Sequence, residues 1–255
     1  MITVLKRAHD YIATYGLLAI LLVIIIGWTV PGLILLGPLP RRWRRAAARY
    51  AIMAGLRLYI GMLTSAGVFR LELEALDTLR GGPPVILTPN HPTSIDAFLL
   101  LSRHPDLACI LKPELMRSPF LGAGARLAGF IRSDPPRRMI REAVAELRRG
   151  GLVLLFPEGT RTTRSPLNPL KGSAELIARL ARVPIQVAII EADSPYLSKG
   201  WPILKVPRLP IRFRVRLGSR LEPAAEGTGG TQALEQALTR ELVGAPQNGW
   251  LGRAA

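Results

Sequence analysis

Residues 11–40 carry no charged side chain, and this stretch constrains the chain more than any other feature of the sequence. Its most apolar part is the 22-residue run 15–36. As an α-helix, such a run would extend about 33 Å, enough to cross the hydrocarbon core of a bilayer. A cleaved signal peptide would have a shorter apolar core and a small-residue cleavage site, and none is obvious here. We therefore predict that this segment is a retained membrane anchor.

The flanks of this segment add detail to the prediction. Pro31 and Gly32 are expected to kink or end the helix, so a re-entrant helix in one leaflet is an alternative to a full span. Residues 41–45 (RRWRR) are typical of the interface at an anionic cytoplasmic leaflet. Residues 44–63 then resemble a second, interfacial amphipathic helix. For both segments, the other alternative is a helical hairpin packed on a soluble core.

The charge of the chain indicates polyanionic partners. It has 34 Lys and Arg against 18 Asp and Glu, a net charge of +16. Such a chain is attracted to nucleic acid, anionic lipid headgroups or an acidic carrier protein, and the apolar amino-terminal segment favours lipid. A membrane-tethered nucleic-acid-binding protein is a distant alternative, because only 6% of residues are aromatic and no binding motif is recognised. The single cysteine, Cys109, cannot form an intramolecular disulfide, which favours a reducing compartment.

After residue 69, short apolar runs alternate with amphipathic segments. The expected strands are 69–74, 85–88, 107–111, 129–131, 152–156, 183–190 and 211–217. The expected helices are 94–103, 114–128 with an interruption at Pro119 and Gly122, 137–149, 173–182 and 231–243. This alternation predicts an α/β fold with a largely parallel sheet flanked by helices, behind an N-terminal two-helix membrane anchor. Three domains follow: membrane-associated helices at 1–65, an α/β domain at 66–225, and a linker with a C-terminal helix at 226–255.

The most informative polar motif is residues 90–96 (NHPTSID), directly after the expected strand 85–88. It places an imidazole, His91, near a carboxylate that could orient it, Asp96, as general-base catalysis requires. On one continuous helix the two side chains would diverge by roughly 140°, but Pro92 keeps His91 out of the helix that follows. The alternative is a capping box over residues 93–96 without a catalytic task, with Asn90 as an ordinary turn residue.

A second motif, residues 156–161 (FPEGTR), ends the expected strand 152–156. Gly159 in a tight loop exposes backbone N–H groups, Thr160 offers a hydroxyl, and Arg161 offers a planar fork suited to phosphate. Lys171 adds positive charge to the same loop, which together predicts a phosphate cradle. The alternative is a surface turn with a solvated pair between Glu158 and Arg161. Because parallel strands end at one edge of a sheet, we predict that both motifs form one active site.

These two motifs, in this order and spacing, resemble those of the glycerolipid acyltransferase family, which includes the bacterial 1-acylglycerol-3-phosphate acyltransferases. The family pattern N-H-x-x-x-x-D matches Asn90, His91 and Asp96, and F-P-E-G-T-R matches residues 156–161 without substitution. Residues 112–115 with 129–131, and residues 183–185, resemble the second and fourth family motifs. The second motif usually ends in an Asp-Arg pair where residues 132–134 read RSD, and the fourth carries a second proline where Gln186 stands.

The resemblance implies a role for each site residue. His91 is expected to take the proton from the acceptor hydroxyl, and Asp96 to hold and balance the imidazolium. The alkoxide then attacks the thioester of acyl-CoA or of an acyl carrier protein. Residues 158–161 (Glu158, Gly159, Thr160 and Arg161) are expected to hold the phosphate of the acceptor, and the resemblance also assigns substrate binding to Asn90, Lys112 and Lys171.

The activity implied is membrane-bound transfer of a fatty acyl group to 1-acylglycerol-3-phosphate, giving phosphatidic acid. The expected location is the cytoplasmic membrane, with the catalytic domain, residues 66–225, on the cytoplasmic side. The two departures leave open a different acceptor or a specialised acyl chain of the ornithine-lipid or aryl-polyene type. Membrane lipids and an acyl carrier protein are the candidate partners, without nucleic acid, and the sequence sets no oligomeric state.

No cofactor or metal is expected besides the thioester co-substrate. The three histidines, His9, His91 and His104, are scattered without ligand spacing, and His104 is expected on a surface loop. Arg212, Arg214 and Arg216 alternate with apolar residues, which predicts a strand with a solvated face. The alternative for this face is a docking surface for anionic lipid or an acidic carrier protein.

Overall fold

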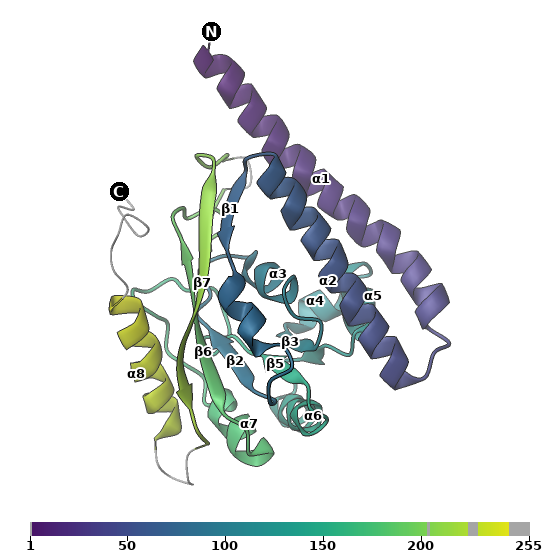
Figure 1. The fold of residues 1–255 in the computed structure, drawn as a ribbon, viewed down its shortest axis with the longest axis vertical. Coiled ribbons are helices and arrows are strands. Elements are labelled where there is room, and N and C mark those ends of the chain that lie inside the picture. Colours follow the sequence, from purple (N-terminus) through teal and green to yellow (C-terminus); the bar gives the residue numbers. More distant parts are fainter. Residues whose placement is uncertain (1, 203–204, 224–228, 245–255) are drawn as a thin grey trace.

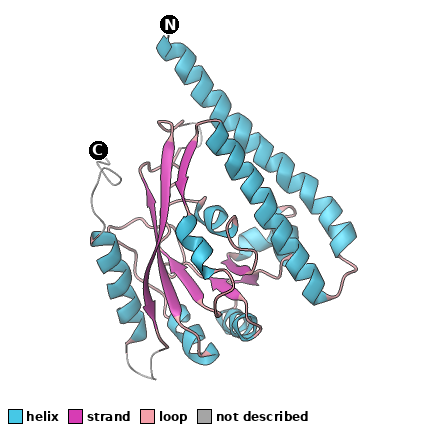
Figure 2. Ribbon diagram, in the orientation of Figure 1, coloured by secondary structure: helices cyan, strands magenta, loops and turns pink. Residues whose placement is uncertain are grey.

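The computed structural model describes residues 2–202, 205–223 and 229–244, and it has a seven-stranded sheet between two layers of helices (Figures 1 and 2). The strands are β1 (Phe69–Glu72), β2 (Ile86–Pro89), β3 (Leu107–Leu111), β4 (Ile131–Arg132), β5 (Leu152–Leu154), β6 (Ile185–Ala192) and β7 (Ile211–Leu221). Their order is β1-β7-β6-β2-β5-β3-β4. The five strands from β6 to β4 are parallel, β7 is antiparallel to β6, and β1 is parallel to β7. The prediction of a largely parallel sheet is therefore confirmed.

The helices cover both faces of this sheet. They are α1 (Ile2–Leu36), α2 (Arg41–Ser65), α3 (Asp96–Leu101), α4 (Pro113–Arg117), α5 (Leu121–Leu127), α6 (Pro136–Arg148), α7 (Ser173–Ala181) and α8 (Gly230–Val243), with a 3-10 turn, η1, at Glu74–Leu79. The core on one face contains residues of α2, α3 and α5, and the core on the other contains residues of α6, α7 and α8. As Pro119 and Gly122 suggested, the segment 114–128 forms two helices. Of the predicted C-terminal region, residues 226–228 and 245–255 lie outside the described residues.

Apolar residues of the central strands alternate between the two cores. In β2, Leu87 joins the core beneath α2 and Ile86 joins the core beneath α6 and α7. In β5, Leu154 and Val153 divide in the same way. Since both faces are covered, these strands read as uninterrupted apolar runs. The two polar motifs therefore come where these strands end, and this confines the candidate site to the edge of the sheet formed by the carboxyl ends of the strands.

Helix α1 is continuous to Leu36, so of the expected kink or end at Pro31 the end is wrong. Contacts just before the proline hold the helix against the rest of the chain. Thr29 Oγ1 donates a hydrogen bond to the carbonyl of Phe120 at 3.2 Å, and Trp28 packs against the core. Tertiary packing of this kind routinely overrides local helix preference.

The stretch Leu18–Leu36 is, by length and composition, able to cross a membrane. Only 11% of it is buried, and Val23, Ile34 and Leu35 each expose two thirds or more of their surface. This supports association with a membrane. In contrast, α2 buries an apolar face in the core of the sheet. The two-helix anchor and the domain boundary at residue 65 therefore stay predictions.

A buried ion pair joins the helical layers around the β4 edge of the sheet. Arg49 Nη1 on α2 lies 2.6 Å from Glu146 Oε1 on α6, with side-chain exposures of 8% and 7%. Arg49 Nε also donates to the carbonyl of Ala128 at 2.8 Å, and Arg149 lies 2.6 Å from the second oxygen of Glu146. Burial by itself raises the pKa of Glu146, but the hydrogen bonds and charges of both arginines outweigh it and hold that pKa below its usual value.

We expect Glu146→Ala to lower the free energy of unfolding by about 3–5 kcal/mol, because it leaves the buried Arg49 guanidinium without its counter-charge. Glu142→Ala is the matched control on the same helix; its exposed pair with Arg138 predicts a change within about 0.5 kcal/mol. Because the folded-state pKa of Glu146 is lowered, its stabilisation is present above the unfolded pKa and is lost as the pH falls through the folded pKa. Chemical unfolding in neutral detergent at several pH values measures both effects, and equal losses in the two variants would contradict this assignment.

Candidate active site

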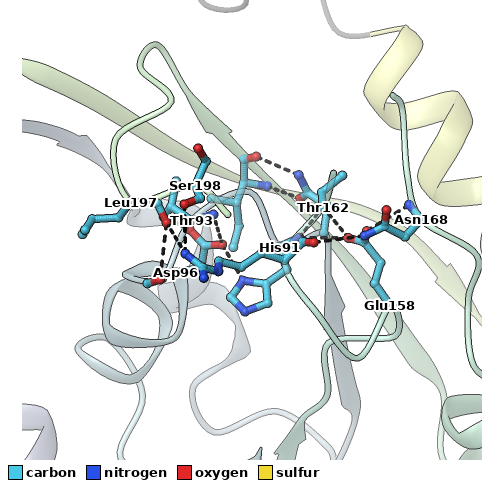
Figure 3. Close-up of polar contacts among 12 residues, drawn as sticks. His91, Thr93, Asp96, Glu158, Thr162, Asn168, Leu197 and Ser198 are labelled. Carbon is cyan, nitrogen blue, oxygen red and sulfur yellow. Dashed lines mark hydrogen bonds and ion pairs between the residues drawn. The ribbon is translucent and has the colours of Figure 1, made fainter. Parts of the chain in front are cut away.

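The two polar motifs meet because the strands before them are neighbours. β2 and β5 pair in parallel, with Leu87 opposite Leu154, so both motifs follow the carboxyl ends of adjacent strands. The backbone of Thr162, in the loop after β5, donates a hydrogen bond to the carbonyl of His91 at 2.7 Å. The loops are therefore joined at this edge of the sheet (Figure 3).

His91 and Asp96 are in direct contact. His91 Nδ1 and Asp96 Oδ2 lie 2.7 Å apart, and α3 begins only at Asp96, so the imidazole stands before the helix. The side chain of Asp96 is fully buried, while that of His91 keeps 18% of its surface exposed. The carboxylate is thus closed to solvent, whereas the ring can be reached by a substrate.

The carboxylate of Asp96 both caps the turn before α3 and contacts the imidazole of His91. The backbone N–H of Thr93 donates to Asp96 Oδ2 at 2.8 Å, as in one half of a capping box, and Thr93 Oγ1 donates to Oδ1 at 2.5 Å. Burial raises the pKa of Asp96, and the hydrogen bonds from His91 and Thr93 act against this rise. The capping contact and the contact with the imidazole are therefore both present in one geometry, and the catalytic task of the pair stays a prediction.

The ring of His91 is also held from its face. It stacks on Phe156, with ring centroids 3.9 Å apart and an angle of 23° between the planes. Phe156 comes two residues after β5 and is the first residue of the second motif. Phe156 belongs to the quoted motif, but no role was predicted for it from the sequence. The sequence signal that could have indicated this contact is an aromatic residue at the end of a strand that is expected to lie beside the predicted base.

Glu158 holds the loops together from a buried position. Its Oε1 accepts hydrogen bonds from Thr162 Oγ1 at 2.5 Å and from the backbone N–H of His91 at 3.2 Å. Its Oε2 accepts one from the backbone N–H of Asn168 at 2.9 Å, and only 3% of the residue is exposed. A buried carboxylate with both oxygens engaged is unsuited to holding a phosphate. The structure therefore makes Glu158 a positioning residue for His91, unlike the predicted role.

Asn90 is likewise engaged with the protein backbone. Its Nδ2 donates to the carbonyl of Ile190 at 2.9 Å, and its Oδ1 accepts from the backbone N–H of Ile190 at 2.7 Å. The amide thereby extends the pairing of β2 with β6 by one further residue. Both polar ends of Asn90 are used in this way, so the predicted substrate contact is replaced by a structural one.

The remaining predicted residues lie on the loops at the same edge. Gly159 has φ +68°, and a Cβ built there would lie 2.6 Å from Lys171 Nζ, so the lysine side chain lies directly over the glycine. Arg161 Nη1 donates to the carbonyls of Leu197 and Ser198 at 2.9 and 3.0 Å. Thr160 is half-buried in the same loop. Lys112 is exposed just after the end of β3, the strand beside β5.

Other expectations are corrected by burial and pairing. His104 is 4% exposed, and its Nδ1 accepts a hydrogen bond from the backbone of Asp106, so it is no surface residue. Gln186 lies at the amino end of β6, where its side chain donates to the carbonyl of Gly218, and this is remote from the edge that carries His91. The departure at Gln186 therefore does not bear on the site.

The arginine face of β7 is covered by carboxylates. Arg212, Arg214 and Arg216 form ion pairs with Asp193, Glu72 and Glu191, respectively. These pairs favour the interpretation of a structural surface over a docking surface. Within the described part of the chain, no three His, Cys, Asp or Glu side chains gather as metal ligands. The expectation of no metal stays a prediction.

The sequence and the fold were then compared with known proteins. The sequence model of the Acyltransferase family matches residues 70–191. A 1-acyl-sn-glycerol-3-phosphate acyltransferase of Pseudomonas aeruginosa is 26% identical over 198 residues, covering 75% of each chain. A chloroplastic enzyme of that name from Arabidopsis thaliana is 25% identical over 203 residues, 76% of this chain and 54% of its own.

A solved structure shares the fold. The crystal structure of the 1-acyl-sn-glycerophosphate acyltransferase PlsC from Thermotoga maritima superposes with a TM-score of 0.71 at 20% identity, covering 94% of this chain and 98% of the other. An α/β sheet with both motifs at the ends of β2 and β5 thus defines an acyltransferase enzyme. The chain is similar in sequence and in fold to members of the glycerolipid acyltransferase family.

The structural task of Asn90 yields a test that requires no substrate. Asn90→Ala leaves the buried N–H and C=O of Ile190 without partners, and we expect a loss of about 1–3 kcal/mol in the free energy of unfolding. The amide of Ile190 should also exchange its hydrogen faster, as mass spectrometry of the peptide containing β6 can measure. An unchanged exchange rate at Ile190 would show that the side chain does not hold this strand.

Proposed function

We propose that the chain transfers a fatty acyl group from an acyl thioester to the hydroxyl of 1-acylglycerol-3-phosphate, giving phosphatidic acid. The observation that carries this proposal is the partly exposed imidazole of His91, bonded at 2.7 Å to a fully buried carboxylate. The relatives from Pseudomonas aeruginosa and Arabidopsis thaliana carry the name of this activity. This chain spans 75% of the first and 54% of the second.

The reaction follows from the tautomer that Asp96 selects. With Nδ1–H donating to the carboxylate, Nε2 carries the free lone pair and takes the proton of the acceptor hydroxyl. The resulting alkoxide forms a bond to the thioester carbonyl, and the tetrahedral intermediate collapses by breaking the C–S bond. The thiolate that leaves then receives the proton from Nε2. No covalent acyl-enzyme is needed, because a thioester is already activated and the enzyme supplies position and a base.

Asp96 stabilises the charge that develops on the ring. The carboxylate has no exposed surface, so water does not screen its attraction for the imidazolium. Thr93 fixes both carboxylate oxygens, and Phe156 fixes the plane of the imidazole. The ring is therefore preorganised before substrate arrives, and little reorganisation is required when it takes the proton.

An apolar groove beside His91 suits the acyl chain. It has a volume of about 190 Å³ and lies between α1, α2, β1 and α3. Ser94 and Ile95, which follow His91 in the same loop, line it together with Leu197, whose carbonyl binds Arg161. Tyr59 and Tyr196 also line it, and burial raises the pKa of each to about 12, so both phenols stay neutral. The groove therefore offers an uncharged, largely apolar surface to a fatty chain.

The acceptor phosphate is assigned to the cations of the loops around His91. Arg161, Lys171 and Lys112 follow the carboxyl ends of β5 and β3, the strands next to β2. The donor is acyl-CoA or an acyl carrier protein, and the membrane-facing helix α1 favours lipid acceptors at the cytoplasmic leaflet. A different acceptor, the other candidate of the sequence analysis, keeps the same chemistry at His91.

We expect His91→Ala to lower kcat by about 10²–10⁴, the usual contribution of a general base. The variant should stay folded at the assay temperature, although its unfolding midpoint should fall because the buried Asp96 loses one of its three donors. Asp96→Asn should lower kcat as well, and the double variant should be no slower than His91→Ala, because the two residues act as one unit. Asp134→Asn, at an exposed carboxylate paired with Arg132, serves as the control. Transfer of labelled acyl groups by purified protein measures these rates. A rate near that of wild type in His91→Ala would exclude His91 as the base.

Recognition of the phosphate can be separated from catalysis by a pair of acceptors. We expect Lys171→Gln and Lys112→Gln to raise KM for 1-acylglycerol-3-phosphate by roughly tenfold or more, because each removes a charge-assisted contact. KM for monoacylglycerol, which lacks the phosphate, should not change. Arg164→Gln removes an exposed charge from the same loop as Lys171 and is the control. Equal changes in KM for both acceptors would show that these lysines do not bind the phosphate.

A further inference from the structure

A second and larger cavity lies along the β4 edge of the sheet. Its volume is about 620 Å³, and it is lined by α6, α4, α5, β4 and the start of α2. It shares no residue with the site around His91. Strands β5 and β3 separate β4 from β2, a distance of about 14 Å at ordinary strand spacing. In Figure 1 the start of α2 and helix α6 lie toward the lower end of the molecule, whereas the tip of β1 and the upper part of α1 lie at the other end.

The cavity has an excess of positive charge. Two glutamates, Glu142 and Glu146, line it together with six arginines: Arg45, Arg117, Arg126, Arg132, Arg138 and Arg149. Just outside the lining, Glu114 pairs with Arg117 and Asp134 pairs with Arg132, so an excess of two positive charges remains. Arg126 and Arg117 come from α5 and α4, where Arg117 exposes 67% of its side chain and Arg126 Nη1 donates to the carbonyl of Met116. Guanidinium groups that come from five elements, α2, α4, α5, β4 and α6, suit a phosphate group.

Arg45 is held close to other cations of this cavity. Its side chain lies over Gly129, which has φ +66° and where a Cβ would stand 2.6 Å from Arg45 Nε. Burial and then the positive charge of Arg149 lower the pKa of Arg45, and Glu146, 3.6 Å away, acts in the opposite direction. A bound anion would remove the repulsion between these cations.

The segments that line the cavity also carry apolar side chains in contact with solvent. Trp43 exposes 60% of its surface, and Leu115, Phe120 and Leu121 expose 40–42% each. Thr29 of α1 is bonded to the carbonyl of Phe120, which brings these residues to the apolar helix. An apolar rim next to a basic cavity, on the side of a candidate membrane helix, matches the surface of an anionic bilayer.

We propose that this cavity binds the headgroup phosphate of an anionic phospholipid and so fixes the orientation of the protein at the membrane surface. The apolar rim favours lipid over a soluble phosphate compound, because the headgroup of a lipid in a bilayer presents its phosphate directly beside hydrocarbon. The lipid bound here is separate from the acceptor at His91. The inference rests on association with a membrane and does not require the proposed reaction.

The test uses the full chain, purified in neutral detergent and mixed with vesicles of phosphatidylcholine alone or with an equal share of phosphatidylglycerol. Flotation measures the bound fraction for wild type and for the double variant Arg117→Gln/Arg126→Gln. We expect phosphatidylglycerol to strengthen binding of the wild type, and the double variant to lose roughly tenfold or more of this gain. Arg117→Lys/Arg126→Lys, which keeps both charges, should recover most of it.

Arg220→Gln/Arg240→Gln is the matched control, because it removes two exposed charges from β7 and α8. An equal loss in this control would show that the net charge attracts the membrane without a site, and would overturn the proposal. The proposal also fails if free coenzyme A releases wild-type protein from the vesicles, since the cavity would then belong to the donor. Absence of acyl transfer would contradict the proposed function only, because flotation does not depend on turnover.

Discussion

The parallel pairing of β2 with β5 is the constraint on which the rest of the site depends. It places the loop with His91 beside the loop with Glu158, although 67 residues separate the two in the chain. Three hydrogen bonds then cross between the loops: the backbone N–H of His91 donates to Glu158 and to Thr162 Oγ1, and the backbone N–H of Thr162 donates to the carbonyl of His91. The position of the imidazole is thus set by the sheet and by backbone contacts, independently of its own side-chain bonds.

A single carboxylate, that of Asp96, then fixes the orientation of the imidazole at this position. Asp96 begins α3, caps the turn before it through Thr93, and orients the imidazole through the same oxygen that accepts from the Thr93 N–H. A buried charge of this kind is tolerated because three donors satisfy it. The three donors are not equivalent for function, since only the imidazole is exposed to a substrate and can change its charge.

Features that depend on local chemistry and on the periodicity of apolar residues could be predicted from the sequence. The strand 107–111 and the contact of His91 with Asp96 followed from an apolar run and from Pro92. The sequence could not predict partners that long-range pairing supplies. Asn90 and Glu158 are polar residues in a site motif, and nothing local shows that Ile190 and Asn168 engage them. The continuation of α1 past Pro31 depends in the same way on contacts with residues about 90 positions away.

Helices α1 and α2 line the apolar groove next to the loop that carries His91. α2 buries one face on the sheet, and its Tyr59 and Leu63 line the apolar groove that reaches Ile95, next to the loop of His91. Leu18 and Leu21 of α1 close the same groove, so the helix that is apolar enough to enter a membrane is itself a wall of the proposed acyl site. In the proposed acyl site, a fatty chain would therefore be buried against the same helix whose exposed apolar surface can enter a membrane.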